Sequence, residues 1–162
     1  MPLRYVTGDP TLTGAQTLAI GHNARGQIEM NPVTVALRQR NPVAFSTYEQ
    51  RCRKEQIQAG DYFIWRDSQP RLMFMAVRES APGTTRLRHV QSVALSVARD
   101  FRLEGIKSLA IAPLFSSDND QLAWREIKKV LEQWFSSSTL TVVVYDQVQQ
   151  GIQADEAWSV PD

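Results

Sequence analysis

Two polar loops contain the residues whose types and spacing could do chemistry. Asn23 follows the apolar run 18–22, and Asp120 follows the apolar run 109–113 and a short polar stretch. If these runs are neighbouring parallel strands, both loops open at the same edge of one sheet, where α/β proteins bind ligands. An acid at such an edge can activate water or stabilise a developing positive charge. The spacing therefore predicts a ligand site with a candidate catalytic acid.

The same residues have structural interpretations. Acids at the start of a helix are favoured by its dipole and by capping, so Asp118 and Asp120 could simply mark a helix start. Asp9 lies in Gly-Asp-Pro, which is an ordinary turn. His22 ends an apolar run and is best interpreted as structural, and His89 falls away from the apolar stripe of its helix, as a surface residue would.

Composition limits the class of protein. The chain has 162 residues, 43% hydrophobic and 22% charged, which fits one globular domain. A net charge of +1 gives no bulk attraction to nucleic acid or membrane. The single cysteine, Cys52, allows no internal disulfide, and with two histidines it argues against a zinc site. With no signal-peptide core and no apolar run of about 18 residues, we expect a cytoplasmic protein without membrane contact, metal or cofactor.

Hydrophobic patterning predicts the elements that position the loops. Strands are predicted over residues 3–7, 17–22, 62–65, 72–77, 108–113 and 139–145. Helices are predicted over residues 33–41, 42–54 and 87–101, the last of these capped by Gly105, and over a segment that carries Ile127 and Trp134. We therefore expect a three-layer α/β/α sandwich with a mostly parallel central sheet over residues 1–146, followed by a C-terminal tail over 147–162.

In this arrangement the carboxyl ends of the strands bring polar residues to one rim. The set comprises Asp9, Asn23, Arg78, residues 116–120, Tyr145 and Asp146. The segment 21–26 has the glycine spacing of a phosphate loop, but Gln27 and Ile28 stand where a lysine and a hydroxyl are needed. This excludes a nucleotide triphosphatase of that type. There is also no Gly-x-Ser-x-Gly elbow, which argues against a serine hydrolase of the α/β type.

Six segments in order carry a resemblance to a known family. They are LRYVTGD (3–9), LAIGHNARG (18–26), VTVALRQRNP (33–42), GIKSLAIAPL (105–114), NDQLAW (119–124) and VVVYD (142–146). Together they resemble the macrodomains, α/β modules that bind ADP-ribose. The chain is most similar to the branch that removes ADP-ribose from protein acids or DNA bases, which includes the terminal ADP-ribose protein glycohydrolases and the antitoxin macrodomains that repair DNA.

The resemblance implies a role for each candidate residue. Asp120 corresponds to the working aspartate of the branch, Asn23 would contact the ribose near the scissile bond, and Asp9 would accept the adenine amine. Tyr145 and Asp146 would border the adenine. The ligand loops would also include Gly26, Ser116, Ser117 and Asp118.

Departures from the family pattern bear on catalysis. The first loop lacks closely spaced glycines and contains Glu29, which is expected to repel a phosphate, and Pro32, which donates no N–H. In the second loop, serines and an acid replace glycines. Arg78 stands where the branch commonly has a nucleophilic lysine, and a guanidinium stays protonated. Arg78 could instead clamp a phosphate or hold Asp120.

Three functions remain as alternatives. The first, which the loops and Arg78 favour, is a divergent macrodomain that binds ADP-ribose or a related nucleotide without catalysis. The second is a glycohydrolase that removes ADP-ribose from protein or DNA, with Asp120 acting on water and Asn23 and Arg78 in the site. The third is a protein-interaction module that binds no nucleotide. The sequence leaves the oligomeric state open.

Overall fold

A twisted sheet forms the centre of the molecule in the computed structural model, which describes residues 3–115 and 121–157. Within these residues the sheet has six strands in the order β1-β6-β5-β2-β4-β3. The strands are β1 (Leu3–Gly8), β2 (Thr17–Asn23), β3 (Tyr62–Trp65), β4 (Arg71–Arg78), β5 (Ser108–Ile111) and β6 (Thr141–Val148). Neighbouring strands pair in parallel except at one edge, where β3 pairs antiparallel with β4.

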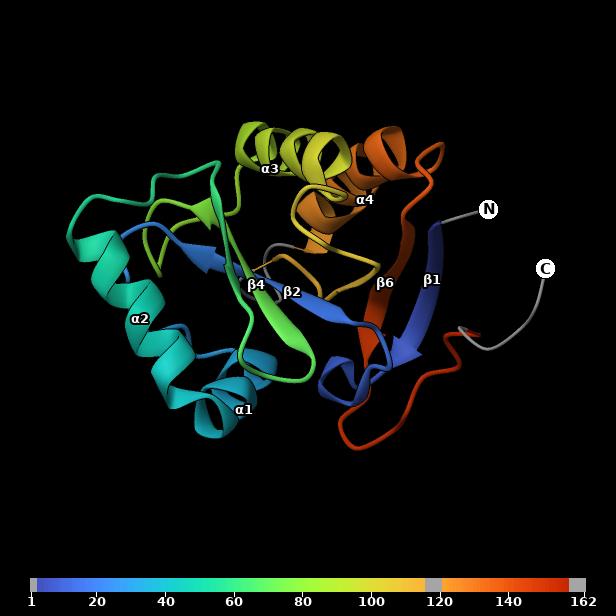
Figure 1. Cartoon of the computed structure of the whole chain (residues 1–162), viewed down its shortest axis with the longest axis horizontal. Coiled ribbons are helices and arrows are strands. Elements are labelled where there is room, and N and C mark those ends of the chain that lie inside the picture. Colours follow the sequence, from blue (N-terminus) through green and yellow to red (C-terminus); the bar gives the residue numbers. More distant parts are fainter. Residues whose placement is uncertain (1–2, 116–120, 158–162) are drawn as a thin grey trace.

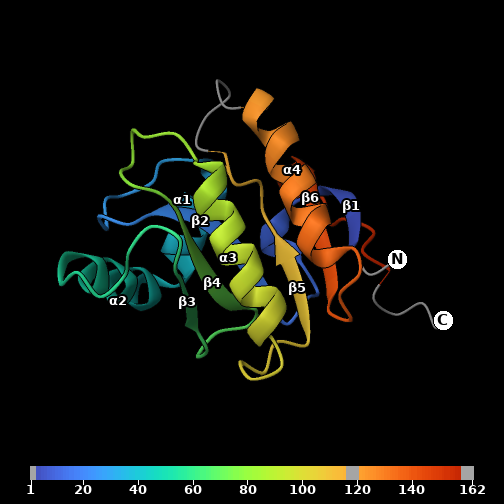
Figure 2. The same ribbon diagram turned by 90° about the horizontal axis from the view of Figure 1, so that it is seen from above.

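Helices cover both faces of this sheet. One face carries α1 (Pro32–Arg40) and α2 (Pro42–Arg53), with the short 3₁₀ helix η1 (Pro10–Leu12) beside β1 (Figure 1). On the other face, α3 (Leu87–Asp100) and α4 (Gln121–Phe135) lie side by side (Figure 2). The expected three-layer α/β/α sandwich with a mostly parallel sheet is confirmed. Among the described residues, none of the helices combines the length and apolar character needed to cross a membrane.

The central strands are apolar on both sides because each side faces a helical layer. On β2, Leu18 and Ile20 pack in the cluster beneath α1 and α2, whereas Ala19 packs in the cluster beneath α3 and α4. All seven residues of β2 are buried. This arrangement explains a strand sequence without apolar–polar alternation.

Most predicted boundaries differ from the structure by one to three residues, and three of the differences have a clear physical reason. β5 ends at Ile111 instead of residue 113, and Pro113 could not have continued the ladder because it has no N–H. α3 ends at Asp100, and Gly105 (φ +74°) closes a separate turn in which the N–H of Ile106 donates to the carbonyl of Phe101. The last strand runs to Val148 because β1 continues to pair with it there.

Candidate ligand site

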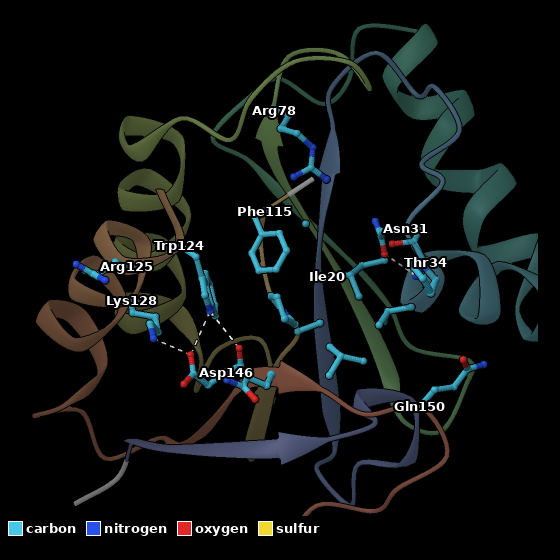
Figure 3. Close-up of a pocket in the computed structure, with 17 residues that line it drawn as sticks. Ile20, Asn31, Thr34, Arg78, Phe115, Trp124, Arg125, Lys128, Asp146 and Gln150 are labelled. Carbon is cyan, nitrogen blue, oxygen red and sulfur yellow. Dashed lines mark hydrogen bonds and ion pairs between the residues drawn. The ribbon is translucent and has the colours of Figure 1, made fainter. Parts of the chain in front are cut away.

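A cleft of about 770 Å³ opens at the carboxyl ends of the parallel strands (Figure 3). Its volume lies within the range of about 300–1,000 Å³ that is usual for small-molecule sites. The start of α1 forms one wall, and α4 forms the opposite wall. The ends of β2, β5 and β6 form the floor between them, so the rim that the sequence predicts is also where the molecule is hollowed.

The α1 wall presents a helix N-terminus to the cleft. Asn31 caps α1, with its side-chain oxygen accepting from the N–H of Thr34 at 2.9 Å. Pro32 occupies the first helical position, as expected, because its fixed φ suits a helix start. Asn31, Pro32, Val33 and Thr34 all line the cleft. An anion there would be stabilised by the positive end of the helix dipole.

The α4 wall combines an aromatic surface with positive charge. The indole N–H of Trp124 donates to Asp146 Oδ1 at 3.2 Å, and Lys128 Nζ donates to the same oxygen at 2.6 Å. Phe115 meets the Trp124 ring edge-on at a centroid distance of 5.9 Å. Arg125 is exposed on the same wall, and no ion-pair partner for it lies among the described residues.

Arg78 lies beneath the cleft and connects three segments of the rim. Its side chain is 1% exposed, and Nη2 lies 3.0 Å from Oε1 of Glu29. Nη1 donates to the hydroxyl of Thr85 at 2.8 Å and to the carbonyl of Leu114 at 2.9 Å. Glu29 also accepts from the side-chain amide of Asn23 at 2.7 Å. The network therefore joins the first loop to the segments that follow β4 and β5.

Glu29, which the sequence suggests would repel a phosphate, is not among the described residues that line the cleft. Its side chain is 3% exposed and its charge is compensated by Arg78. The sequence shows an acid in the loop, but it does not show that the carboxylate turns inward. The exposed residues of the loop include Ile28 and Met30 instead.

Asn23 holds the first loop in place. It pairs with Arg78 across β2 and β4, so the two are neighbours at the rim. Its side-chain oxygen accepts from the N–H groups of Arg25 and Gln27 at 3.1 and 3.0 Å. Its side-chain nitrogen donates to the Gln27 carbonyl at 2.9 Å as well as to Glu29. The side chain of Asn23 is therefore engaged by its own loop.

Other predicted site residues lie beside the cleft rather than in its lining. Among the described candidates, Arg78 and Asp146 line it, whereas Asp9, Asn23, Gly26 and Tyr145 do not. Tyr145 is buried and donates to Glu156; burial first, and then this hydrogen bond, raise its pKa. The position of Gly26 is explained by close packing on α2, since an added Cβ would lie 2.6 Å from the Glu49 carbonyl oxygen. The candidates Ser116, Ser117, Asp118 and Asp120 lie outside the described residues.

The two histidines differ in burial. His22 is completely buried, and its Nδ1 accepts from the N–H of Asn23 at 2.8 Å. Burial lowers the pKa of His22 to about 3, so it stays neutral, as a structural histidine does. The side chain of His89 is 12% exposed and lies near Glu79, so it is not the surface residue that the sequence suggests. Among the described residues there is no cluster of Cys, His, Asp or Glu suited to a metal ion.

Sequence reasoning missed much of the cleft lining. Trp124 and Lys128 are four residues apart and Arg125 and Lys128 three apart, so the helical period places them on one side of α4. That spacing was an available signal, although charged residues on a helix usually indicate a solvated face. The capping residue Asn31 and the tail residue Gln150 gave no comparable signal, because their place at the cleft depends on tertiary packing.

Solved structures of macrodomains share this fold. The macrodomain of Thermus aquaticus DarG matches with a TM-score of 0.78 and 21% identity, over 88% of this chain and 97% of that one. The macrodomain of Mycobacterium tuberculosis DarG matches with a TM-score of 0.78 and 20% identity, over 88% and 96%. Thermosipho africanus DarTG, solved in complex with ADP-ribose, matches with a TM-score of 0.76 and 14% identity, over 95% of this chain and 44% of that one. No protein-family model and no curated protein matches the sequence. These likenesses confirm the predicted macrodomain fold.

Proposed function

We propose that this chain, a macrodomain in fold, binds ADP-ribose or a closely related nucleotide in the cleft between α1 and α4. The observation that supports this proposal is the composition of the two walls of the cleft. The N-terminus of α1 lies across the cleft from α4, and the rings of Trp124 and Phe115 lie alongside. These walls suit a ligand in which a diphosphate joins a flat aromatic base to hydroxylated sugars. Thermosipho africanus DarTG, which was solved in complex with ADP-ribose, contains the same fold, and this supports the choice.

The charge balance of the cleft favours an anion. Glu29 compensates Arg78, and Asp146 is compensated by Lys128. Among the described lining residues, this leaves the positive end of α1 and Arg125, an exposed residue of α4 whose side chain points away from Trp124 in Figure 3. A diphosphate at the start of α1 would gain stabilisation from the helix dipole, and the positive charge of Arg125 would add attraction over a longer distance.

Binding without catalysis is the favoured form of the proposal. Arg78 occupies the position of the family nucleophile, and its guanidinium is held by Glu29, Thr85 and a backbone carbonyl. A guanidinium held in this way fixes the segments that form the rim of the cleft, and it remains protonated. We further propose that ADP-ribose is presented on a macromolecule, protein or DNA, and that the chain acts in the cytoplasm, where the buried thiol of Cys52 stays reduced.

A glycohydrolase is the second candidate. Trp124, the last residue of the NDQLAW motif, lies on the cleft wall, so the helix that carries this motif borders the cleft. Asp120 directly precedes that helix in the chain. In this alternative Asp120 would activate water or stabilise positive charge on the ribose as the bond breaks.

Calorimetric titration with ADP-ribose tests the proposal. We expect one site per chain, weakened about fivefold or more by Arg125→Ala, because this removes a positive charge near the cleft that has no ion-pair partner among the described residues. Lys107→Ala is the matched control, since Lys107 precedes β5 at the opposite end of the strands. Absence of binding to the unmodified chain would overturn the proposal and favour the interaction module. Release of free ADP-ribose from modified protein or DNA, abolished by Asp120→Ala, would establish the glycohydrolase.

A further inference from the structure

The C-terminal segment 149–156 packs against the end of β1 and reaches the cleft. The N–H of Gln149 donates to the Gly8 carbonyl at 2.9 Å, and the N–H of Asp9 donates to the Ile152 carbonyl at 2.7 Å. A Cβ at Gly8 would lie 2.8 Å from Ala154, so the close approach requires a glycine there. The segment is therefore fixed along the strand end, and in Figure 1 it runs beneath β6 and β1.

A buried carboxylate fastens the far end of this segment. Glu156 is 7% exposed and accepts from the Thr13 hydroxyl at 2.6 Å and the Gly14 N–H at 2.8 Å. It also accepts from the hydroxyl of Tyr145 on β6. With both ends held, the residues between them have a defined position next to the cleft.

The carboxylate of Asp9 is hydrogen-bonded to this segment. One carboxylate oxygen accepts from the N–H and the hydroxyl of Thr11, at 2.9 and 2.7 Å. The other accepts from the N–H of Gly151 at 2.8 Å. Burial opposes ionisation, but these hydrogen bonds outweigh it and lower the pKa of Asp9. Asp9 is 8% exposed as a whole residue and is not among the described residues that line the cleft.

Gln150, the residue immediately before Gly151, does line the cleft. Its side chain is exposed, and among the described residues its amide has no hydrogen-bond partner. Figure 3 places it at the opposite end of the cleft from Arg78, on the side of Thr34. The lining also includes the apolar residues Ile20 and Val148. A side-chain amide at the edge of a cleft with apolar lining suits a nucleobase, because an amide can donate to one atom of an adenine edge and accept from the next.

We infer that Gln150 reads the nucleobase and that Asp9 is a positioning residue, which acts by holding the segment that presents Gln150. This inference rests on the proposed function, because it assigns the base end of the same cleft. It departs from the expectation that Asp9 itself accepts the adenine amine. If Gln150 contacts the base, a change at Gln150 alters the base selectivity. If Asp9 contacts the base, a change at Asp9 alters it instead.

The test compares ADP-ribose with its hypoxanthine analogue, in which a carbonyl replaces the adenine amine. A glutamine amide can rotate to suit either base, whereas a carboxylate only accepts. Gln150→Glu should therefore raise the preference for adenine over hypoxanthine at least tenfold, measured as a ratio of dissociation constants. Gln153→Glu puts the same charge on an exposed position of the segment outside the described lining, and it should leave this ratio unchanged. Equal ratios in the two variants would overturn the inference.

Asp9→Asn provides the second arm. If Asp9 acts through the segment, Asp9→Asn weakens both ligands alike, and it adds nothing in a Gln150→Ala background, because both changes remove the same contact. Amide exchange over residues 149–152 should also accelerate. If Asp9 touches the base, Asp9→Asn changes the selectivity ratio by itself, and the inference fails. Failure of the unmodified chain to bind ADP-ribose would instead overturn the proposed function.

Discussion

Replacing Glu29 with alanine should destabilise the fold by about 3–5 kcal/mol, because it leaves a charged guanidinium buried without its counter-ion. The side chains of Arg78 and Glu29 are 1% and 3% exposed, so water cannot replace the lost partner without local opening. For a chain of 162 residues, about 2–4 °C of melting temperature corresponds to each kcal/mol. We therefore expect the melting temperature to fall by about 6–20 °C.

Calorimetry and urea unfolding would measure this loss, and an exposed pair on α4 provides the control. Lys129 and Glu126 lie 3.3 Å apart with side chains 66% and 53% exposed. Lys129→Ala should cost less than about 1 kcal/mol, because water screens such a pair. The paired replacement Glu29→Leu with Arg78→Met should recover much of the stability, since it removes both buried charges together. A loss in Glu29→Ala no larger than that in Lys129→Ala would refute the view that this ion pair anchors the first loop.

Three further outcomes follow from the same structure. Because burial lowers the pKa of His22 to about 3, the unfolded chain takes up a proton at higher pH than the folded chain does. The stability associated with a neutral His22 is complete above about pH 6.5 and falls by about 2 kcal/mol between pH 7 and 5, a slope that His22→Phe should flatten in urea unfolding. Asn31→Asp should keep or raise the melting temperature, since an acid caps a helix well, yet weaken ADP-ribose binding about fivefold or more by repelling the diphosphate, as titration would show. ADP-ribose should change the tryptophan fluorescence, and Trp124→Phe should remove most of the change, whereas Trp134→Phe, outside the described cleft lining, should keep it. An unchanged pH slope, an unaltered affinity or an equal signal in both tryptophan variants would contradict the respective argument.

The sheet and its helices could be predicted because the hydrophobic spacing and the residues that begin and end elements indicate the same structure. The strand over residues 62–65 matches β3 at both ends, and Pro32 begins α1 as its fixed φ suggests. The apolar stripe of α3 identified that helix because Val90, Ala94 and Val97 recur at helical spacing on the buried side. These features depend on residues close together in the chain, which is why sequence reasoning reached them.

The lining of the cleft depends on contacts between distant residues. The segment around Gln150 is bonded to Asp9 and Thr13, among other residues near the start of the chain, over a sequence separation of more than a hundred residues. The Asp9 carboxylate was predicted at the rim, and it does follow the end of β1. Its hydrogen bond to Gly151 could not be predicted, because no local pattern links a polar tail to a turn at the other end of the chain.

Two departures from the family pattern, which look independent in the sequence, are joined in the structure. By the resemblance, the first loop lacks the glycines of the family and contains Glu29, and Arg78 stands where the branch commonly has a lysine. Glu29 and Arg78 form one ion pair, and the guanidinium of Arg78 also donates to the Thr85 hydroxyl and the Leu114 carbonyl. A lysine presents a single ammonium and could not span these partners in the same geometry. The arginine that removes the nucleophile is therefore also the group that holds a glycine-poor loop at the cleft, which is why a binding role accounts for both departures together.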